Sequence, residues 1–452
     1  MTSFIAKTRE LFDRFDPKYV AFKRRMANFR YPSVKIGSLL SEPPEYGAGE
    51  AGIERLNDTT PRYIRITDID ENGELLPGLG MTAANVEPQY FLRDGDLLFA
   101  RSGNTVGKSY LHESERVSYP CFYAGYMIRF RFGEKVLPKY VFTFAQTPYY
   151  HEWVSAIQRS AGQPNINAQE YRNLEIPLPP LPEQRKIVAE LDAAYAAKRA
   201  ADERATKLLA SIDEMVLKEL GIANLPKPDT SLSSRIFTVP AREVANATLA
   251  PDHYFDSIDF SKAKYPCERF IERIDIDPPC GFERITKLVP MESVSAEWCA
   301  IESIEDISPD ATQGYSTFRG GDVIWARITP CMENGKSAVV EAEPSECFCG
   351  STEFLVFRPK DDKVNPYYLQ SLLHLKRFRE VAAHHFTGTS GHQRVTADFF
   401  KAISIPIPPR SVQDRVASTA SSIRAEARKL KADATAALEV AKRKIEAKIV
   451  KV

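Results

Sequence analysis

The sequence predicts an α+β protein in which two globular domains stand in tandem, each followed by a long helix, with the two helices paired as an antiparallel coiled coil. Three observations support this prediction. The chain has 452 residues, which is more than one ordinary domain requires. A set of motifs occurs twice in the same order, and each copy ends in a long segment with an apolar seam.

The repeated motifs recur with offsets that stay between 226 and 229 residues. They are a Gly-Asp-hydrophobic run at 95–101 and 321–327, a Gly-Lys-Ser turn at 107–109 and 335–337, a helix start at 137–141 and 365–369, and a Pro-rich corner at 176–180 and 405–409. A shared order at a nearly constant offset indicates a duplicated unit. The period is far longer than that of a solenoid repeat.

Each copy mixes strand and helix signals. Short β-rich runs such as 63–67 and 353–357 alternate with Gly, Pro and Asn turns, and helical segments follow them. We expect a first domain over residues 1–181, a spacer helix over 182–221, a second domain over 222–409 and a second spacer helix over 410–452.

Both predicted spacer helices carry apolar or small residues at alternating steps of four and three, which is the seam of a coiled coil. The seam runs from Ile187 to Met215 in the first helix and from Val412 to Ile449 in the second. Neither seam can be buried alone, so we expect the helices to pack on each other. An antiparallel pair would separate the domains by about 55 Å, at about 1.5 Å per residue. A homo-oligomeric coiled coil is the alternative.

Composition limits the class of protein. Lys and Arg total 60 against 60 Asp and Glu, so net charge alone does not indicate a nucleic-acid binder. No run of about 18 apolar residues predicts a membrane helix, and residues 1–7 lack the apolar core of a signal peptide, so we expect a cytoplasmic protein. The seven cysteines include no C-x-x-C pair, which predicts reduced thiols and no metal site.

Two short motifs resemble catalytic sequences, but each lacks a required part. Residues 103–109 end in Gly-Lys-Ser, yet three residues separate the glycines where a phosphate-binding loop has four. Strand-like segments follow both Gly-Lys-Ser turns, whereas such a loop opens a helix. Asp277-Pro278-Pro279-Cys280 lacks the aromatic residue of an amino-methyltransferase motif. We therefore predict a chain without catalytic residues; a nucleotide-dependent enzyme that uses these turns is the alternative.

The end of the first copy resembles the junction found in specificity subunits of Type I restriction-modification systems. The shared pattern is Gly162-Gln163-Pro164-Asn165-Ile166, a short helix, the corner at 176–184 and a long helix. The resemblance covers almost the whole chain in both copies. The second copy departs from it, with Gly391-His392-Gln393-Arg394-Val395 and Arg410-Ser411-Val412-Gln413 at the matching places.

The resemblance implies a DNA-binding specificity subunit in which each domain recognises one half of an asymmetric, bipartite target in double-stranded DNA. It implies two methylase subunits and a restriction and translocation subunit as partners. S-adenosylmethionine, ATP and Mg would bind to those partners, and no cofactor is expected on this chain. A specificity subunit that serves a Type II-like fused nuclease-methylase is the alternative.

Basic and amide side chains on turns of both copies are the candidate DNA contacts, because Arg and Lys suit phosphate and guanine whereas Asn and Gln suit adenine. In the first copy they are Arg101, Lys108, Arg159, Gln163 and Asn165. In the second copy they are Arg327, Lys336, Thr389, His392, Gln393 and Arg394.

Structural roles are the alternative for the residues that both copies share. Arg101 and Arg327 would then pair with buried carboxylates, and the Gly-Lys turn would serve only the fold. Residues that read bases should differ between the copies, because the two half-sites differ. Shared positions are therefore better candidates for phosphate contact or for the fold.

Overall fold

The computed structural model describes residues 18–20, 22, 29–103, 105–158, 164–227, 229, 231, 233, 236, 238–241, 254, 256–281, 285–389 and 393–450. The chain falls into two compact units. Unit 1 comprises residues 1–200 and 433–452, and unit 2 comprises residues 201–432. Each unit therefore holds one copy of the duplicated domain together with about half of each long helix.

Unit 1 contains two four-stranded sheets and one short ladder. The first sheet has the order β2 (Glu45–Tyr46), β9 (Met127–Phe130), β6 (Leu97–Ala100), β7 (Ser109–Leu111), with all neighbours antiparallel. The second has the order β3 (Gly52–Glu54), β5 (Met81–Ala83), β4 (Arg62–Ile64), β8 (Cys121–Tyr123), and its β4–β8 pair is parallel. The ladder joins β1 (Ser33–Lys35) to β10 (Glu175–Pro177).

Unit 2 repeats the topology of the first sheet, whereas in its second sheet the parallel pair lies in the centre and not, as in unit 1, at one edge. Its first sheet has the order β12 (Ile274–Ile276), β19 (Phe354–Pro359), β16 (Val323–Ala326), β17 (Ser337–Val339), again antiparallel throughout. The second has the order β14 (Glu305–Asp306), β13 (Lys287–Val289), β18 (Cys347–Gly350), β15 (Ser316–Arg319), and its β13–β18 pair is parallel. Short ladders join β11 (Cys267–Arg269) to β22 (Ser404–Pro406) and β20 (Phe386–Thr387) to β21 (Arg394–Val395).

The helices of the two domains also correspond. Unit 1 has α2 (Pro138–Ala145), α3 (Pro148–Ile157) and α4 (Ala168–Arg172), and unit 2 has α8 (Phe270–Arg273), α9 (Pro366–His374), α10 (Lys376–His384) and α11 (Ala397–Ala402). The helices predicted at 137–141 and 365–369 are confirmed as α2 and α9. Each has a proline in its first turn, where the missing N–H needs no partner.

The Gly-Asp motif forms the turn that leads into the central strand of each unit. Its glycine has a φ of 82° in unit 1 and 86° in unit 2, a left-handed backbone that glycine adopts without steric cost. The buried Asp96 accepts hydrogen bonds from Arg131 at 2.6 and 3.0 Å, and the buried Asp322 accepts them from Arg358 at 2.7 Å twice. The same bidentate ion pair thus neutralises a buried carboxylate in both units.

A buried glutamine fixes the start of each long helix to its domain. The side chain of Gln184 accepts the N–H of Leu137 at 2.9 Å and donates to the carbonyl of Pro179 at 2.8 Å. Gln413 makes the same contacts with Asn365 and Pro408, both at 2.8 Å. Both glutamines are fully buried. The Pro-rich corner, the start of α2 or α9 and the long helix therefore meet at one amide group in each unit.

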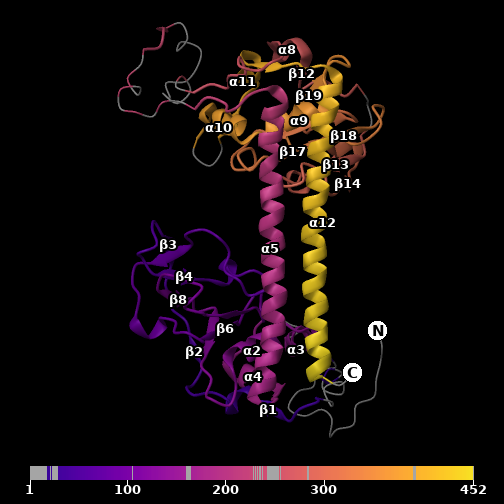
Figure 1. Ribbon diagram of the computed structural model, residues 1–452. Coiled ribbons are helices and arrows are strands. Elements are labelled where there is room, and N and C mark those ends of the chain that lie inside the picture. Colours follow the sequence, from indigo (N-terminus) through magenta and orange to yellow (C-terminus); the bar gives the residue numbers. More distant parts are fainter. Residues whose placement is uncertain are drawn as a thin grey trace. The chain divides into compact units, whose positions relative to one another are not determined.

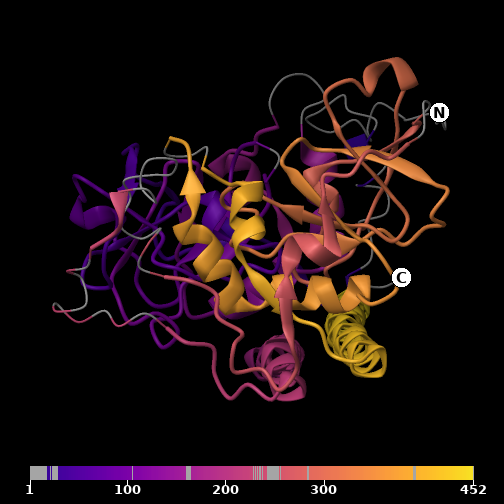
Figure 2. The ribbon, with the colours of Figure 1, turned by 90° about the horizontal axis from the view of Figure 1, so that it is seen from above.

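The long helices are α5 (Leu181–Leu220) and α12 (Arg410–Ile449), which Figure 1 and Figure 2 show side by side. In unit 1 the start of α5 lies beside the end of α12, where Glu190 pairs with Lys448. In unit 2 the end of α5 lies beside the start of α12, where Glu219 pairs with Arg415 at 2.9 Å. The predicted antiparallel coiled coil is confirmed.

The predicted seam is buried or half-buried along both helices. In unit 1, Leu191 of α5 and Leu438 of α12 belong to one core with the domain helices, and in unit 2 Val216 and Val416 do so. The buried face of each long helix therefore packs partly against the other long helix and partly against a globular domain. This double contact explains why neither helix needs strong intrinsic propensity to form.

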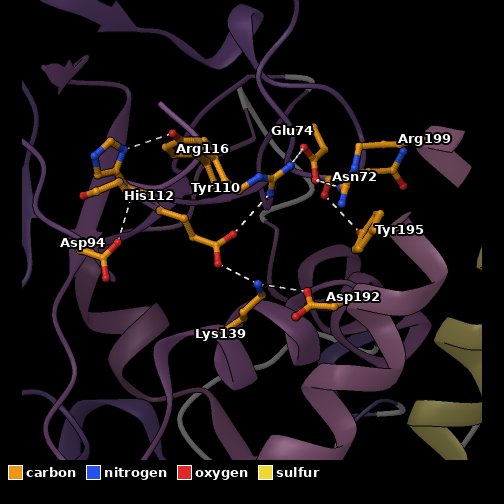
Figure 3. A network of polar contacts seen from close by, with 12 residues as sticks. Asn72, Glu74, Asp94, Tyr110, His112, Arg116, Lys139, Asp192, Tyr195 and Arg199 are labelled. Atoms are coloured by element: carbon orange, nitrogen blue, oxygen red, sulfur yellow. Dashed lines mark hydrogen bonds and ion pairs between the residues drawn. The ribbon is translucent and has the colours of Figure 1, made fainter. Parts of the chain in front are cut away.

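A loop at residues 70–74 holds the domain of unit 1 to both helix segments. The hydroxyl of Tyr195 on α5 donates to the carbonyl of Asn72 at 3.2 Å (Figure 3). The buried amine of Lys442 on α12 donates to the side-chain oxygen of Asn72 at 3.0 Å. One asparagine therefore contacts both helices.

Ion pairs extend this contact along α5, as Figure 3 shows. Glu74 pairs with Arg116 and with Arg199 of α5, the latter at 3.3 Å. Lys139 pairs with Asp192 of α5 at 3.1 Å. Burial alone would lower the pKa of Lys139, but its hydrogen bonds with Glu113 and Asp192 outweigh that effect and raise the pKa.

Unit 2 uses a corresponding loop around Trp298. Lys431 and Arg428 of α12 lie over the indole ring, at 5.7 and 5.9 Å from its centroid. Glu297 pairs with Lys431, and Glu302 pairs with Arg428 at 3.0 Å. The same part of the fold meets α12 in both units, but through a buried amide contact in unit 1 and through cation–π contacts in unit 2.

The prediction of reduced cysteines is wrong for one pair. Cys280 and Cys347 form a disulfide, with their Cα atoms 6.4 Å apart. They lie 67 residues apart in the chain, and only the folded domain brings the segment after β12 against β18 of the other sheet, so spacing could not reveal the pair. Cys121, Cys267, Cys299, Cys331 and Cys349 are free.

Across the described ranges, no helix combines the length and the apolar character needed to cross a membrane.

Replacing Gln184 or Gln413 by Leu should lower the free energy of unfolding by about 1–3 kcal/mol each, because buried backbone groups lose their partners while the side-chain volume is kept. Urea unfolding followed by circular dichroism measures this. The matched control is Gln313→Leu at an exposed loop position. Equal losses in all three variants would contradict the role assigned to the buried amides.

Candidate nucleic-acid interface

In unit 1, backbone hydrogen bonds join the end of the central strand, β6, to two other segments of the chain. Arg101 follows β6 directly, and its N–H donates to the carbonyl of Tyr126 at 2.9 Å. The carbonyl of Arg101 accepts the N–H of Ile166 at 2.8 Å. Ser102 and Asn165 then form an isolated antiparallel bridge. Three segments of the chain therefore converge at one point.

Unit 2 has the same backbone arrangement with different side chains. The N–H of Arg327 donates to the carbonyl of Glu353, and the carbonyl of Arg327 accepts the N–H of Val395, both at 2.9 Å. Ile328 and Arg394 form the bridge. We call this arrangement the strand-end platform; it consists of residues 101, 102, 126 and 165 in unit 1 and residues 327, 328, 353 and 394 in unit 2.

The two platform arginines stand in different surroundings. The guanidinium of Arg101 lies over the ring of Tyr46, at 4.8 Å from its centroid, which holds the cation in a defined orientation. Burial raises the pKa of Asp277, which follows β12, and the charge of Arg327 opposes that rise. Within the described part of the chain, neither arginine forms an ion pair and the Nε atom of each is buried without a hydrogen-bond partner. The alternative of a buried ion pair is therefore not supported.

The remaining platform positions differ between the units. Tyr126 leaves 67% of its surface exposed, although it is a large aromatic residue. Its counterpart Glu353 is half-buried and accepts hydrogen bonds from Arg394 at 2.6 and 2.8 Å. This contact raises the pKa of Arg394. Asn165, the counterpart of Arg394, is half-buried.

Two tyrosine hydroxyls support the platform of unit 1. Tyr171 of α4 donates to the carbonyl of Ala100 and Tyr150 of α3 to the carbonyl of Gly107, both at 2.8 Å. Phe400 of α11 and Phe378 of α10 occupy the matching positions in unit 2. Phenylalanine has no hydroxyl, so unit 2 lacks both hydrogen bonds and relies on ring packing such as that of Phe400 against Trp325.

The lysines of the Gly-Lys-Ser turns contact carbonyl groups of the fold. The amine of Lys108 donates to the carbonyl of Ile69 at 2.9 Å, and that of Lys336 donates to the carbonyl of Met291 at 2.8 Å. The serines are also engaged, since Ser109 accepts from Gln146 at 2.9 Å. Both lysines thus hold the turn beside the second sheet, and their contact with DNA stays a prediction.

The other predicted DNA contacts do not share one kind of position in the structure. Arg159, Gln163 and His392 lie outside the described residues. Thr389 is exposed on the turn after β20, and the carbonyl of Gln393 accepts the N–H of Thr329 at 3.1 Å. Gln393 therefore lies directly beside the platform of unit 2.

Each unit also contains a cavity, which is lined by platform residues in unit 1 but in unit 2 adjoins the platform only through Gln393. The cavity in unit 1 has a volume of about 850 Å³, and its walls include Tyr63, Arg65, Ser102 and Tyr126. The cavity in unit 2 has a volume of about 970 Å³, and its walls include Thr387 and Gln393. Among the described side chains, no group of His, Cys, Asp and Glu is arranged to hold a metal ion.

Fold and platform together define a duplicated α+β protein with one strand-end platform per unit. Residues 63–206 and 292–439 match the family model described as "Type I restriction modification DNA specificity domain". The two matches cover more than half of the chain. The chain therefore belongs to the Type I restriction-modification DNA specificity domain family.

Individual relatives resemble shorter parts of the chain. It is 33% identical over 135 residues to the EcoAI specificity subunit of Escherichia coli, covering 30% of this chain and 23% of that one. It is 29% identical over 143 residues to the EcoEI specificity subunit of Escherichia coli, covering 31% and 24%. The matched part thus spans about a quarter of these relatives. A solved chain of a Type I restriction-modification system aligns over 93% of this chain and 96% of its own, with 18% identity and a TM-score of 0.48.

Sequence reasoning missed Tyr46, Tyr126, Glu353 and Asp277 as parts of the candidate interface. Tyr126 and Glu353 occupy equivalent backbone positions at an offset of 227 residues, but they share no chemistry. A search for repeated motifs therefore does not detect them. Alignment of the two copies at the constant offset, which pairs residues of different type between the motifs, could have identified them.

Lys108→Met and Lys336→Met should each lower the free energy of unfolding by about 1 kcal/mol, because a carbonyl of the adjoining loop loses its charged donor. Thermal unfolding of the purified chain, with and without ATP, measures this. The exposed Lys135→Met is the control. ATP-dependent stabilisation that disappears in the two variants would instead support nucleotide binding at these turns.

Proposed function

We propose that this chain is the specificity subunit of a Type I restriction-modification complex and that it binds an asymmetric, bipartite sequence in double-stranded DNA. Each unit would contact one half-site through its strand-end platform. The observation that carries the proposal is the duplicated platform, which keeps one backbone arrangement and changes its side chains. One protein that reads two unlike half-sites requires this combination.

Family membership supports the choice of DNA as the ligand. Arg101 and Arg327 are shared by the two units, so we assign them to phosphate groups, which are the same in every half-site. Arginine suits this role because its guanidinium is always charged and can donate two parallel hydrogen bonds to a phosphate. Lys108 and Lys336 stay secondary candidates because each already donates to a carbonyl group.

The chain would act without catalysing a reaction. We propose two methylase subunits and a restriction and translocation subunit as its partners, with S-adenosylmethionine, ATP and Mg bound by those subunits. DNA modification of this kind would place the complex in the cytoplasm. A partner that fuses nuclease and methylase in a Type II-like enzyme is the second candidate, and purification of the native complex distinguishes the two.

The function is tested by expressing the chain with its methylase partner and mapping methylated adenine in host DNA by long-read sequencing. We expect one motif with two specified halves and an unread spacer. A strain in which the chain is deleted is the control, and it should lose the motif while keeping the methylase. Complete absence of a bipartite motif would refute the proposal.

Phosphate contact predicts a change in salt dependence. Arg101→Ala and Arg327→Ala should each reduce the slope of log Kobs against log salt concentration by about 0.9, because one fewer counterion is released. The loss should be similar for target and non-target duplexes. Fluorescence anisotropy at several salt concentrations measures it, with the exposed Arg185→Ala as the control. An unchanged slope would remove these arginines from the interface.

A further inference from the structure

We infer that two of the three positions at which the platforms differ form a base-reading pair: Tyr126 with Asn165 in unit 1, and Glu353 with Arg394 in unit 2. Asn165 would recognise an adenine edge and Arg394 a guanine edge. This inference rests on the proposed function and adds to it the residues that distinguish one half-site from the other.

The backbone makes the two pairs equivalent. Tyr126 and Glu353 each offer a carbonyl to the arginine at the end of the central strand, at 2.9 Å in both units. Asn165 and Arg394 each form the isolated bridge with the residue that follows that arginine. The Cα positions are thus set by hydrogen bonds that no side chain makes. Side chains at these positions can change without moving the platform.

The unit 1 pair combines an amide with an exposed ring. In the residues that the structure describes, the side-chain amide of Asn165 has no hydrogen-bond partner, and it is not fully buried. An asparagine side chain offers an NH2 group as donor and a carbonyl oxygen as acceptor, which match N7 and the N6 amino group of adenine in the major groove. Tyr126 is 67% exposed beside it and supplies an apolar surface for the neighbouring thymine methyl or sugar.

In the unit 2 pair, the carboxylate of Glu353 orients the guanidinium of Arg394. Glu353 accepts from Nε of Arg394 at 2.8 Å and from Nη2 at 2.6 Å, while 38% of the arginine side chain stays exposed. A carboxylate that holds one edge of a guanidinium fixes the plane of the whole group. An arginine fixed in this way matches the O6 and N7 acceptors of guanine, and little side-chain entropy remains to be lost on binding.

Exchange of the pairs tests the inference. The double variant Tyr126→Glu with Asn165→Arg places the unit 2 pair on the unit 1 platform, and Glu353→Tyr with Arg394→Asn does the reverse. Each variant of the full-length chain, assembled with its methylase partner, is offered a pool of duplexes randomised over both half-sites. The bound duplexes are then sequenced. The control exchange is Lys287→Glu with Glu346→Lys, an exposed ion pair of unit 2 that lies outside the platform.

We expect the first double variant to change its preference from adenine to guanine at one position of one half-site, by about 10- to 100-fold. The other half-site and the control exchange should keep the original sequence. A variant that binds every duplex more weakly, without a change of preferred base, would overturn the inference. If the unaltered chain selects no bipartite sequence, the proposed function fails instead, so the two failures are distinguishable.

A conservative variant covers the case in which an exchanged pair does not fold. Arg394→Lys keeps the charge opposite Glu353 but removes the planar fork. We expect it to lose about 10-fold in preference for guanine over adenine while its affinity for non-target DNA stays within about twofold. Retention of the full preference would show that Arg394 does not read the base.

Discussion

The duplicated fold depends on a buried glutamine amide at the start of each long helix. Gln184 and Gln413 join the N–H at the start of α2 or α9 to a carbonyl of the Pro-rich corner, and both glutamine side chains are fully buried. A buried amide that loses one partner leaves an unsatisfied group, so these contacts form together or not at all. In each unit, the long helix therefore keeps one orientation relative to the domain that carries the platform.

The fold was largely predictable, because its signals are periodic or repeated. The seam predicts both long helices, and the constant offset predicts two copies of one domain. The candidate interface was predictable only in part. Arg101 and Arg327 are identical and stand out, whereas Tyr126 and Glu353 are brought to them by backbone hydrogen bonds that depend on no particular side chain. The Cys280–Cys347 pair could not be predicted for a related reason, since only the tertiary fold brings the two cysteines together.

In each platform, the groups that maintain the backbone shape are different from the side chains that we propose to read the DNA. Backbone hydrogen bonds and the Asp–Arg ion pairs behind the central strand maintain the shape of the platform, and they are the same in both units. The side chains that differ lie on this constant frame, whose backbone hydrogen bonds they do not make. A protein built in this way can acquire a new recognition residue with a small change in stability, because the frame does not depend on the residue replaced.

The strand ends of the two units are held by different contacts. In unit 1, each hydrogen bond from Tyr150 or Tyr171 to a backbone carbonyl adds about 1 kcal/mol against local opening. Phe378 and Phe400 offer no such bond, and the platform of unit 2 has instead the ion pair between Glu353 and Arg394. The backbone of unit 1 is therefore secured from beneath by hydroxyl groups, whereas an ion pair between side chains of the platform itself secures that of unit 2.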